Sequence, residues 1–211
     1  MECVIGIVGK DFVLVASDTN QAHSIVIMKQ DDDKLFRIND RGAMLVTGEP
    51  GDKVNFAEFI QRNLQLYKMI NGYDLSIHAA ANYTRRELAT SLRSRGPYNV
   101  NMLIAGHDEH DGASLYFMDY LASLVKLPFA IHGYGSFFGL SICDKYYKPE
   151  MSEAEALNLL NKIVAEIQKR LLVQLPSFHV RVISKEGIKD LPSIYAKYQG
   201  DQAVRHESME I

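Results

Sequence analysis

The sequence predicts an α+β fold, a four-layer αββα sandwich in which two antiparallel sheets pack face to face and a helix pair covers each outer side. Strand-forming segments occur in blocks that are separated by helix pairs, which does not suit alternating βαβ units. The first two strands, residues 3–8 and 12–16, are apolar at nearly every position, and this indicates burial on both faces. Asp111-Gly112 favours a tight hairpin between neighbouring strands.

The first block of strands begins with a β-hairpin. Gly9-Lys10-Asp11 joins its two strands, and Asp18 follows the second strand at the edge of the buried sheet. An acidic turn at Asp31-Asp32-Asp33 precedes Lys34, which opens another strand. The remaining strands of this block are expected at residues 25–29, 34–38 and 43–47.

The first helix pair should follow Pro50-Gly51. Asp52 is the expected N-cap of the first helix, and Asn71-Gly72 should end it. Its inward stripe is expected to be Phe56, Phe59, Ile60, Leu64 and Tyr67. A second helix is expected over residues 74–93, with Ile77, Ala80, Ala81, Thr84, Leu88 and Leu92 inward. Its other face is basic and carries Arg85, Arg86, Arg93 and Arg95. We expect this face to be solvated, although it could contact a partner.

The second half repeats the pattern of strands and then helices. Strands are expected at residues 100–105, 113–118, 123–126 and 129–132. A helix should run to about Tyr147, and Ser152 and Glu155 form a capping box for a longer one. The inward face of that longer helix is expected to be Leu157, Leu160, Val164, Ile167 and Leu171. Last strands are expected at residues 179–183 and 194–195.

Composition indicates a globular protein that works in a reducing compartment. The chain has 211 residues, a net charge of −3 and 47% apolar residues, so nothing global favours nucleic acid or a membrane surface. Cys3 and Cys143 are expected to be buried thiols. Neither a secretory signal nor a run of ~20 apolar residues is visible, and we expect a cytoplasmic and nuclear protein. We expect one domain, residues 1–199, and a C-terminal tail, residues 200–211.

Several local motifs resemble the proteasome β-subunit family, which has the N-terminal nucleophile hydrolase fold. They are Leu14-Val-Ala-Ser-Asp18, the strand at Lys34, Thr47-Gly48 and His132-Gly-Tyr-Gly-Ser136. Together with the order of elements, the resemblance extends from residue 1 to about 196. Further segments resemble one branch of the family, which fills the fourth position of the β ring. They are Glu58–Asn63, Leu66–Met69, Asn71–Tyr73, Thr84–Arg86 and Tyr116–Tyr120.

The resemblance implies a catalytic cluster that this chain lacks in part. Active members attack peptide bonds with an N-terminal threonine, assisted by Asp, Lys and Ser side chains and an oxyanion-binding Gly N–H. Asp18, Lys34 and Gly48 match the family's Asp, Lys and Gly. Four registers of that cluster hold other residues: Glu2 for the nucleophile, Tyr134 for the Ser, and Leu171 and Gln174 for a distal Asp–Ser pair. We therefore expect no cleavage activity.

The matching residues have a structural explanation. Asp18 and Lys34, expected on adjacent buried strands, can remain as an ion pair because losing one partner leaves the other charge unpaired. Gly48 can remain as a turn residue. The resemblance implies a structural β subunit of the 20S core particle, surrounded by other α and β subunits in a 28-subunit assembly. It implies neither a cofactor nor a metal. It also implies that the tail lies on a neighbouring subunit; the alternative is a disordered end.

Other interpretations remain open at this point. The chain could be a stand-alone N-terminal nucleophile hydrolase that uses Cys3 after processing, or a homomeric ring protein. His107 and His110 could ligate a metal, but a solvated hairpin turn is the simpler interpretation. His132 and His179 are expected to be satisfied core or interface residues.

Overall fold

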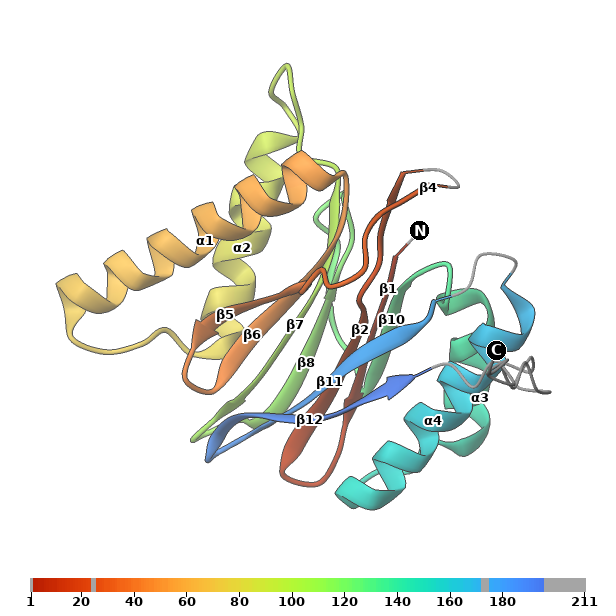
Figure 1. Ribbon diagram of the computed structural model, residues 1–211. Coiled ribbons are helices and arrows are strands. Elements are labelled where there is room, and N and C mark those ends of the chain that lie inside the picture. The colour runs from red at the N-terminus through yellow and green to blue at the C-terminus, as the bar shows by residue number, and fades with distance from the viewer. Residues whose placement is uncertain (1, 24–25, 172–174, 196–211) are drawn as a thin grey trace, which may run out of the picture.

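A computed structural model describes residues 2–23, 26–171 and 175–195 and confirms the four-layer sandwich (Figure 1). The first sheet has the order β10-β1-β2-β11-β12, and all of its pairings are antiparallel. Its strands are β1 Cys3–Val8, β2 Phe12–Asp18, β10 Phe129–Gly133, β11 Ser177–Ser184 and β12 Gly187–Tyr195. Thus β1 and β2 are interior strands, which explains why they are apolar on both faces.

The second sheet is also antiparallel and is nearly contiguous in sequence, with the order β5-β6-β7-β8-β9. Its strands are β5 Leu35–Asn39, β6 Gly42–Gly48, β7 Val100–Asp108, β8 Gly112–Met118 and β9 Leu124–Lys126. A separate two-stranded ribbon is formed by β3 Gln21–His23 and β4 Val26–Lys29.

A helix pair covers the outer face of each sheet. The helices α1 Pro50–Asn71 and α2 Ile77–Ser91 pack on the second sheet, and α3 Ser136–Tyr146 and α4 Glu153–Arg170 pack on the first (Figure 1). No helix in the described part of the chain is long and apolar enough to span a membrane.

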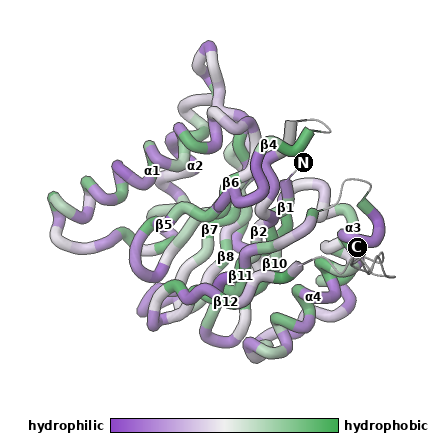
Figure 2. The backbone as a smooth tube through the Cα atoms, viewed as in Figure 1, coloured by the Kyte–Doolittle hydropathy of each residue, from purple (hydrophilic) through white to green (hydrophobic). Residues whose placement is uncertain are grey.

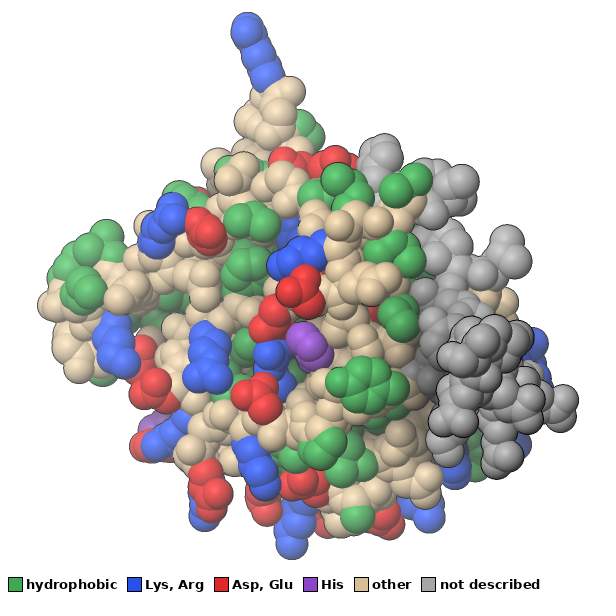
Figure 3. All heavy atoms as spheres, viewed as in Figure 1, with side chains coloured by type: hydrophobic (Ala, Val, Ile, Leu, Met, Phe, Trp, Pro, Cys, Tyr) green, Lys and Arg blue, Asp and Glu red, His purple; other side chains and the backbone are tan. Residues whose placement is uncertain are grey.

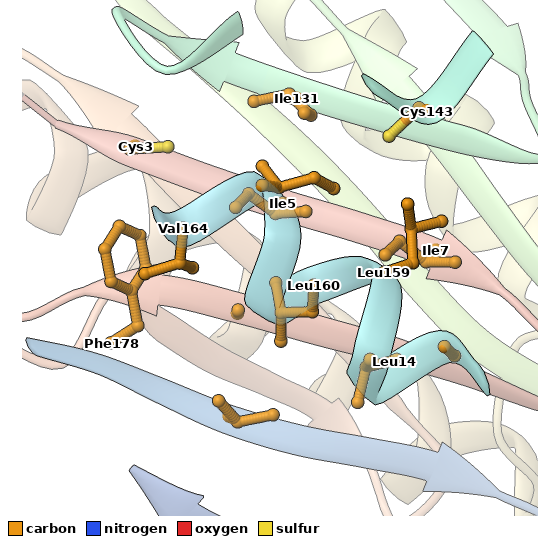
Figure 4. Close-up of a cluster of buried hydrophobic side chains, with 14 of the residues drawn as sticks. Cys3, Ile5, Ile7, Leu14, Ile131, Cys143, Leu159, Leu160, Val164 and Phe178 are labelled. Carbon is orange, nitrogen blue, oxygen red and sulfur yellow. The ribbon is translucent and has the colours of Figure 1, made fainter. Parts of the chain in front are cut away.

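Three apolar layers hold the sandwich together. Alternation along β1 sends Cys3, Ile5 and Ile7 into the apolar layer under α4 that also contains Leu160 (Figure 4), and sends Val4 toward the opposite sheet. The helix-facing residues of the second sheet pack against α1 and α2 in the same way. Figure 2 shows apolar segments running along the strands of both sheets.

Several boundaries differ from the sequence-based predictions. Helix α1 begins earlier than predicted, because Glu49 is its N-cap and Pro50 lies in its first turn. The Asp52 carboxylate instead accepts a hydrogen bond of 3.0 Å from the Asn99 N–H. Helix α2 begins later, at Ile77, where the Ser76 hydroxyl accepts a bond of 3.1 Å from Ala79. The inward face of α2 is as predicted, and the arginines of its other face are exposed.

The last strand was predicted too short. Strand β12 includes Lys189, Asp190 and Pro192, which break an apolar pattern, but it lies at the edge of the sheet where charges and proline are tolerated. On α1, Phe59 is 40% exposed rather than buried, and Lys53 lies on the buried face. The predicted capping box of α4 is present at Ser152 and Glu155.

Candidate functional site

The candidate site lies at one end of the sandwich, where β2 ends and the chain enters β5. Asp18 is the last residue of β2, and Lys34 precedes β5 of the opposite sheet. The prediction that they stand on adjacent strands is therefore wrong: the pair bridges the two sheets. Lys34 Nζ lies 3.1 Å from Asp18 Oδ2, and neither side chain is exposed.

Lys34 has no proton left for a substrate. Its ammonium donates to Asp18 Oδ2 at 3.1 Å and to the carbonyl oxygens of Asp18 and Asn20, each at 2.8 Å. These three acceptors match the three protons of an ammonium group. A fourth oxygen, Asp32 Oδ2, lies 3.7 Å away. Such full pairing offsets the cost of burying the charge.

Asp18 is held by the first residues of β1. Its Oδ1 accepts a hydrogen bond of 2.7 Å from the Cys3 N–H, and its Oδ2 accepts one of 3.2 Å from the Asn20 N–H. Burial raises the pKa of the Asp18 carboxyl, while the Lys34 ammonium and the Cys3 N–H oppose the rise. The carboxylate thus fixes the beginning of β1 against the end of β2.

Glu2 lies at the position that the resemblance assigns to the nucleophile, and its carboxylate is bound on both oxygens. Oε2 accepts a hydrogen bond of 2.8 Å from the Gly48 N–H, the group to which the resemblance assigns the oxyanion register. Oε1 lies 2.8 Å from Lys53 Nζ, which also contacts Asp32 Oδ2 at 2.9 Å. A charged network therefore runs from Glu2 through Lys53 and Asp32 to Lys34.

The backbone at Gly48 explains why glycine is required there. Its φ is +139°, and a Cβ atom would lie 2.2 Å from the carbonyl oxygen of Asn99. This conformation ends β6 and directs the chain into α1. The Gly48 N–H is thereby presented to Glu2.

Lys53 and Asp32 are site residues that the sequence analysis missed. Lys53 is only 2% exposed, and it occupies the apolar stripe of α1 with Phe56, Ala57, Ile60 and Leu64. A lysine in register with an apolar stripe was the available signal, because buried lysines require a paired charge. Burial alone would lower the pKa of Lys53, but Glu2 and Asp32 outweigh it and raise the pKa.

Among the described residues, neither Tyr134 nor Leu171 forms a side-chain hydrogen bond with this network, although Tyr134 follows Gly133, which pairs with Cys3. Tyr134 is 52% exposed and packs beside Phe137. Leu171 is the C-cap of α4 and packs against the core of the first sheet. Gln174 lies outside the described residues. The nearby Ser136 hydroxyl donates to the Gly133 carbonyl oxygen at 2.7 Å.

Cys3 is a buried thiol. Its side chain is 0% exposed and packs in the core beneath α4, and burial and the Asp18 charge raise its pKa far above the ordinary range. Cys143 is also buried, and desolvation raises its pKa to about 12. Both thiols are therefore protonated at neutral pH.

The histidines give no metal site within the described residues, where no group of three or more His, Cys, Asp or Glu side chains is placed to hold an ion. His132 stacks on Phe117 with ring centroids 4.0 Å apart, and burial lowers its pKa to about 4. Its Nε2 lies 3.2 Å from the Met102 carbonyl oxygen. His179 differs from expectation, because its Nδ1 is buried without a hydrogen-bond partner among the described residues.

A family model for proteasome subunits matches residues 1–183. The chain belongs to the proteasome subunit family. Proteasome subunit beta type-2-A of Arabidopsis thaliana is 47% identical over 190 residues, which cover 90% of this chain and 93% of that protein. Proteasome subunit beta type-2 of Oryza sativa is 49% identical over 90% of this chain and 89% of that protein. Proteasome subunit beta type-4 of Saccharomyces cerevisiae is 39% identical over 93% of this chain and 100% of that protein.

These relatives confirm the branch of the family that the sequence indicates. The motifs quoted above point to the branch that includes the proteasome β type-2 subunit, and relatives named β type-2 and β type-4 match the chain over nine-tenths of its length. The chain is thus a proteasome β-type subunit, a component of the machinery of protein degradation.

Proposed function

We propose that this chain is a non-catalytic structural β subunit of the 20S proteasome core particle. It forms part of the β ring that encloses the proteolytic chamber, and it serves ubiquitin-dependent protein degradation in the cytoplasm and the nucleus. The observation that carries the proposal is the carboxylate of Glu2 at the nucleophile register, bound to the Gly48 N–H at 2.8 Å. A carboxylate there supplies no hydroxyl and occupies the donor that an oxyanion would need.

The rest of the site supports the same conclusion. Lys34 donates to three protein oxygens, so its ammonium is committed to the fold rather than to a substrate or a nucleophile. The registers of the auxiliary Ser and the distal Asp hold Tyr134 and Leu171, which offer neither an aliphatic hydroxyl nor a carboxylate. The cluster therefore stabilises the sandwich without performing chemistry.

Exposed apolar surface supports assembly with other subunits. The end of α1 extends beyond the second sheet (Figure 1). It carries Leu66, Met69 and Ile70, and Tyr73 follows its C-cap; these four residues are 52–73% exposed. Figure 3 shows apolar side chains gathered at that end of the molecule. Contiguous exposed apolar groups are typical of protein interfaces. The partners in this proposal are the other proteasome α and β subunits of a 28-subunit particle.

The proposal also covers the C-terminal tail. Residues 200–211 lie outside the described residues, and we propose that this tail lies on a neighbouring subunit, beyond the domain formed by residues 1–199. Deletion of residues 200–211 should then lower the yield of assembled particle relative to the full chain. An unchanged yield would remove this role.

Labelling of the purified particle tests the absence of catalysis. The chain is tagged, purified from its own cells, and treated with a peptide electrophile that reacts covalently with N-terminal threonine nucleophiles. We expect co-purification of a set of distinct related subunits, with covalent adducts on some of them and none on this chain in its intact mass. The labelled subunits are the internal control. An adduct on this chain, a chain processed to begin at Cys3, or an isolated monomer would each contradict the proposal.

A further inference from the structure

The Gly48 N–H and the Lys53 ammonium form a two-donor pocket for an anion. Both donors contact one carboxylate: Gly48 N lies 2.8 Å from Glu2 Oε2, and Lys53 Nζ lies 2.8 Å from Glu2 Oε1. One donor belongs to the backbone at Gly48, whose φ is +139°, and the other is carried by a side chain from the first turn of α1. The two donors belong to separate elements, and Asp32 Oδ2, 2.9 Å from Lys53 Nζ, provides a second contact that holds the ammonium.

We propose that these two donors, called here the Gly48–Lys53 anion site, are a binding site for small carboxylates that the chain's own Glu2 fills. The carboxylate of Glu2 acts as an internal ligand, tethered by two methylene groups. If the tether is cut back to its Cβ atom, the site accepts free acetate, which has the same atoms as the removed fragment. This proposal does not depend on the function proposed above.

Burial and access support this proposal. The Lys53 side chain is 3% exposed, so its ammonium is sheltered and must have acceptors. The Glu2 side chain is 14% exposed, so the residue that fills the site borders the surface. Low solvent exposure strengthens a charge-assisted hydrogen bond relative to one in water.

The charge balance sets the strength of binding. Asp32 Oδ2 lies 2.9 Å from Lys53 Nζ and already neutralises part of its charge. A free carboxylate must also give up its translational freedom, which the tether of Glu2 removes in advance. We therefore expect acetate to bind a Glu2→Ala variant with a dissociation constant on the order of millimolar.

The readout is the acylation of Lys53 by an amine-reactive ester, measured by peptide mass spectrometry on the full chain with the subunits that accompany it. In the wild type, Glu2 and Asp32 cover the ammonium and labelling of Lys53 should be slow. Glu2→Ala should increase labelling at Lys53 several-fold. Acetate at tens of millimolar should restore slow labelling, whereas chloride at equal ionic strength and the neutral isostere acetamide should not.

Two further variants make the test specific. Glu109→Ala removes a carboxylate from the exposed pair with Arg41 and should leave Lys53 labelling at the wild-type level. Glu2→Gln keeps an oxygen for the Gly48 N–H but fills the pocket, so Lys53 should label faster and acetate should have no effect. Intact mass establishes the N-terminal residue of every variant.

Defined outcomes would overturn the proposal. Labelling of the Glu2→Ala variant that does not respond to acetate, or that responds equally to chloride, excludes a carboxylate site. If Glu2→Ala gives little folded protein, the refolding yield in acetate and in chloride becomes the readout. Equal yields in the two salts would then reject the site, and a higher yield in acetate would support it.

Discussion

Asp18 and Lys34 form a fully buried ion pair, 3.1 Å between Oδ2 and Nζ, that joins the end of one sheet to the start of the other. Replacing Lys34 with Met leaves the Asp18 carboxylate without its cation. We expect Lys34→Met to lower the free energy of unfolding by about 3–5 kcal/mol, measured by denaturant unfolding of the full chain. Asp18→Asn combined with Lys34→Met should cost less than Lys34→Met alone.

An exposed pair provides the control for that experiment. Lys29 and Asp31 lie 3.6 Å apart with side chains 51% and 84% exposed. Lys29→Met should change the free energy of unfolding by less than about 1 kcal/mol. Equal losses for Lys29→Met and Lys34→Met would show that the buried pair has no special importance.

Gly48 should not tolerate a side chain. Gly48→Ala places a Cβ atom 2.2 Å from the Asn99 carbonyl oxygen in a backbone with φ of +139°, so the junction between β6 and α1 must shift. We expect a loss of more than about 1 kcal/mol in the free energy of unfolding. Gly51→Ala is the matched control: no atom lies within 4 Å of its Cβ, and alanine should stabilise α1 slightly.

Asp33 should contribute to stability only above acidic pH. Burial opposes its ionisation, but the Arg181 guanidinium, bound to Oδ1 at 2.8 Å and Oδ2 at 2.7 Å, outweighs burial and lowers its pKa below the ordinary 3.8. The stabilisation is therefore present above the unfolded-state pKa and is lost as pH falls through the lower folded-state pKa.

The corresponding experiment compares Asp33→Asn with the wild type over a range of pH. The difference in unfolding free energy should be largest above about pH 4 and should vanish in stronger acid. It should stay below about 1 kcal/mol, because the side chain is 43% exposed. Asp31→Asn, at a site 84% exposed, should show a smaller difference, and an equal one would contradict the pairing argument.

The two thiols should be unreactive in the folded chain. Cys3 and Cys143 are buried, and burial raises the pKa of Cys143 to about 12. We expect alkylation of neither thiol under native conditions at neutral pH, and of both in denaturant, as counted by intact mass. Rapid native alkylation of Cys3 would revive the alternative of a cysteine nucleophile.

The sequence predicted the layers of the fold because periodicity records burial. Strands β1 and β2 alternate between two apolar layers, so their continuous apolar runs indicated a sandwich before any contact was known. The inward face of α2 was predicted for the same reason. Only the last two residues of edge strand β12 were predicted, because the strand lies at the edge of the sheet and its residues follow no apolar pattern.

The pairing of the site was less predictable. Asp18 and Lys34 were expected together from the resemblance, but the approach of Glu2 to Gly48 and Lys53 joins residues far apart in sequence. No local pattern encodes which carboxylate meets a buried lysine, since that depends on how the two sheets stack. Lys53 could have been flagged as a charge on an apolar stripe, but its partners could not have been named.

The order of strands has a consequence for folding during synthesis on the ribosome. The second sheet uses residues 35–126 without interruption by the first, so it can form from a single nascent segment. Strands β1 and β2 emerge first, yet their outer neighbours β10 and β11 are among the last to be made. The opening hairpin, which is apolar on both faces, therefore lacks its neighbour β11 until most of the chain has been translated. Apolar surface and strand edges left exposed in this way make a nascent chain prone to aggregation.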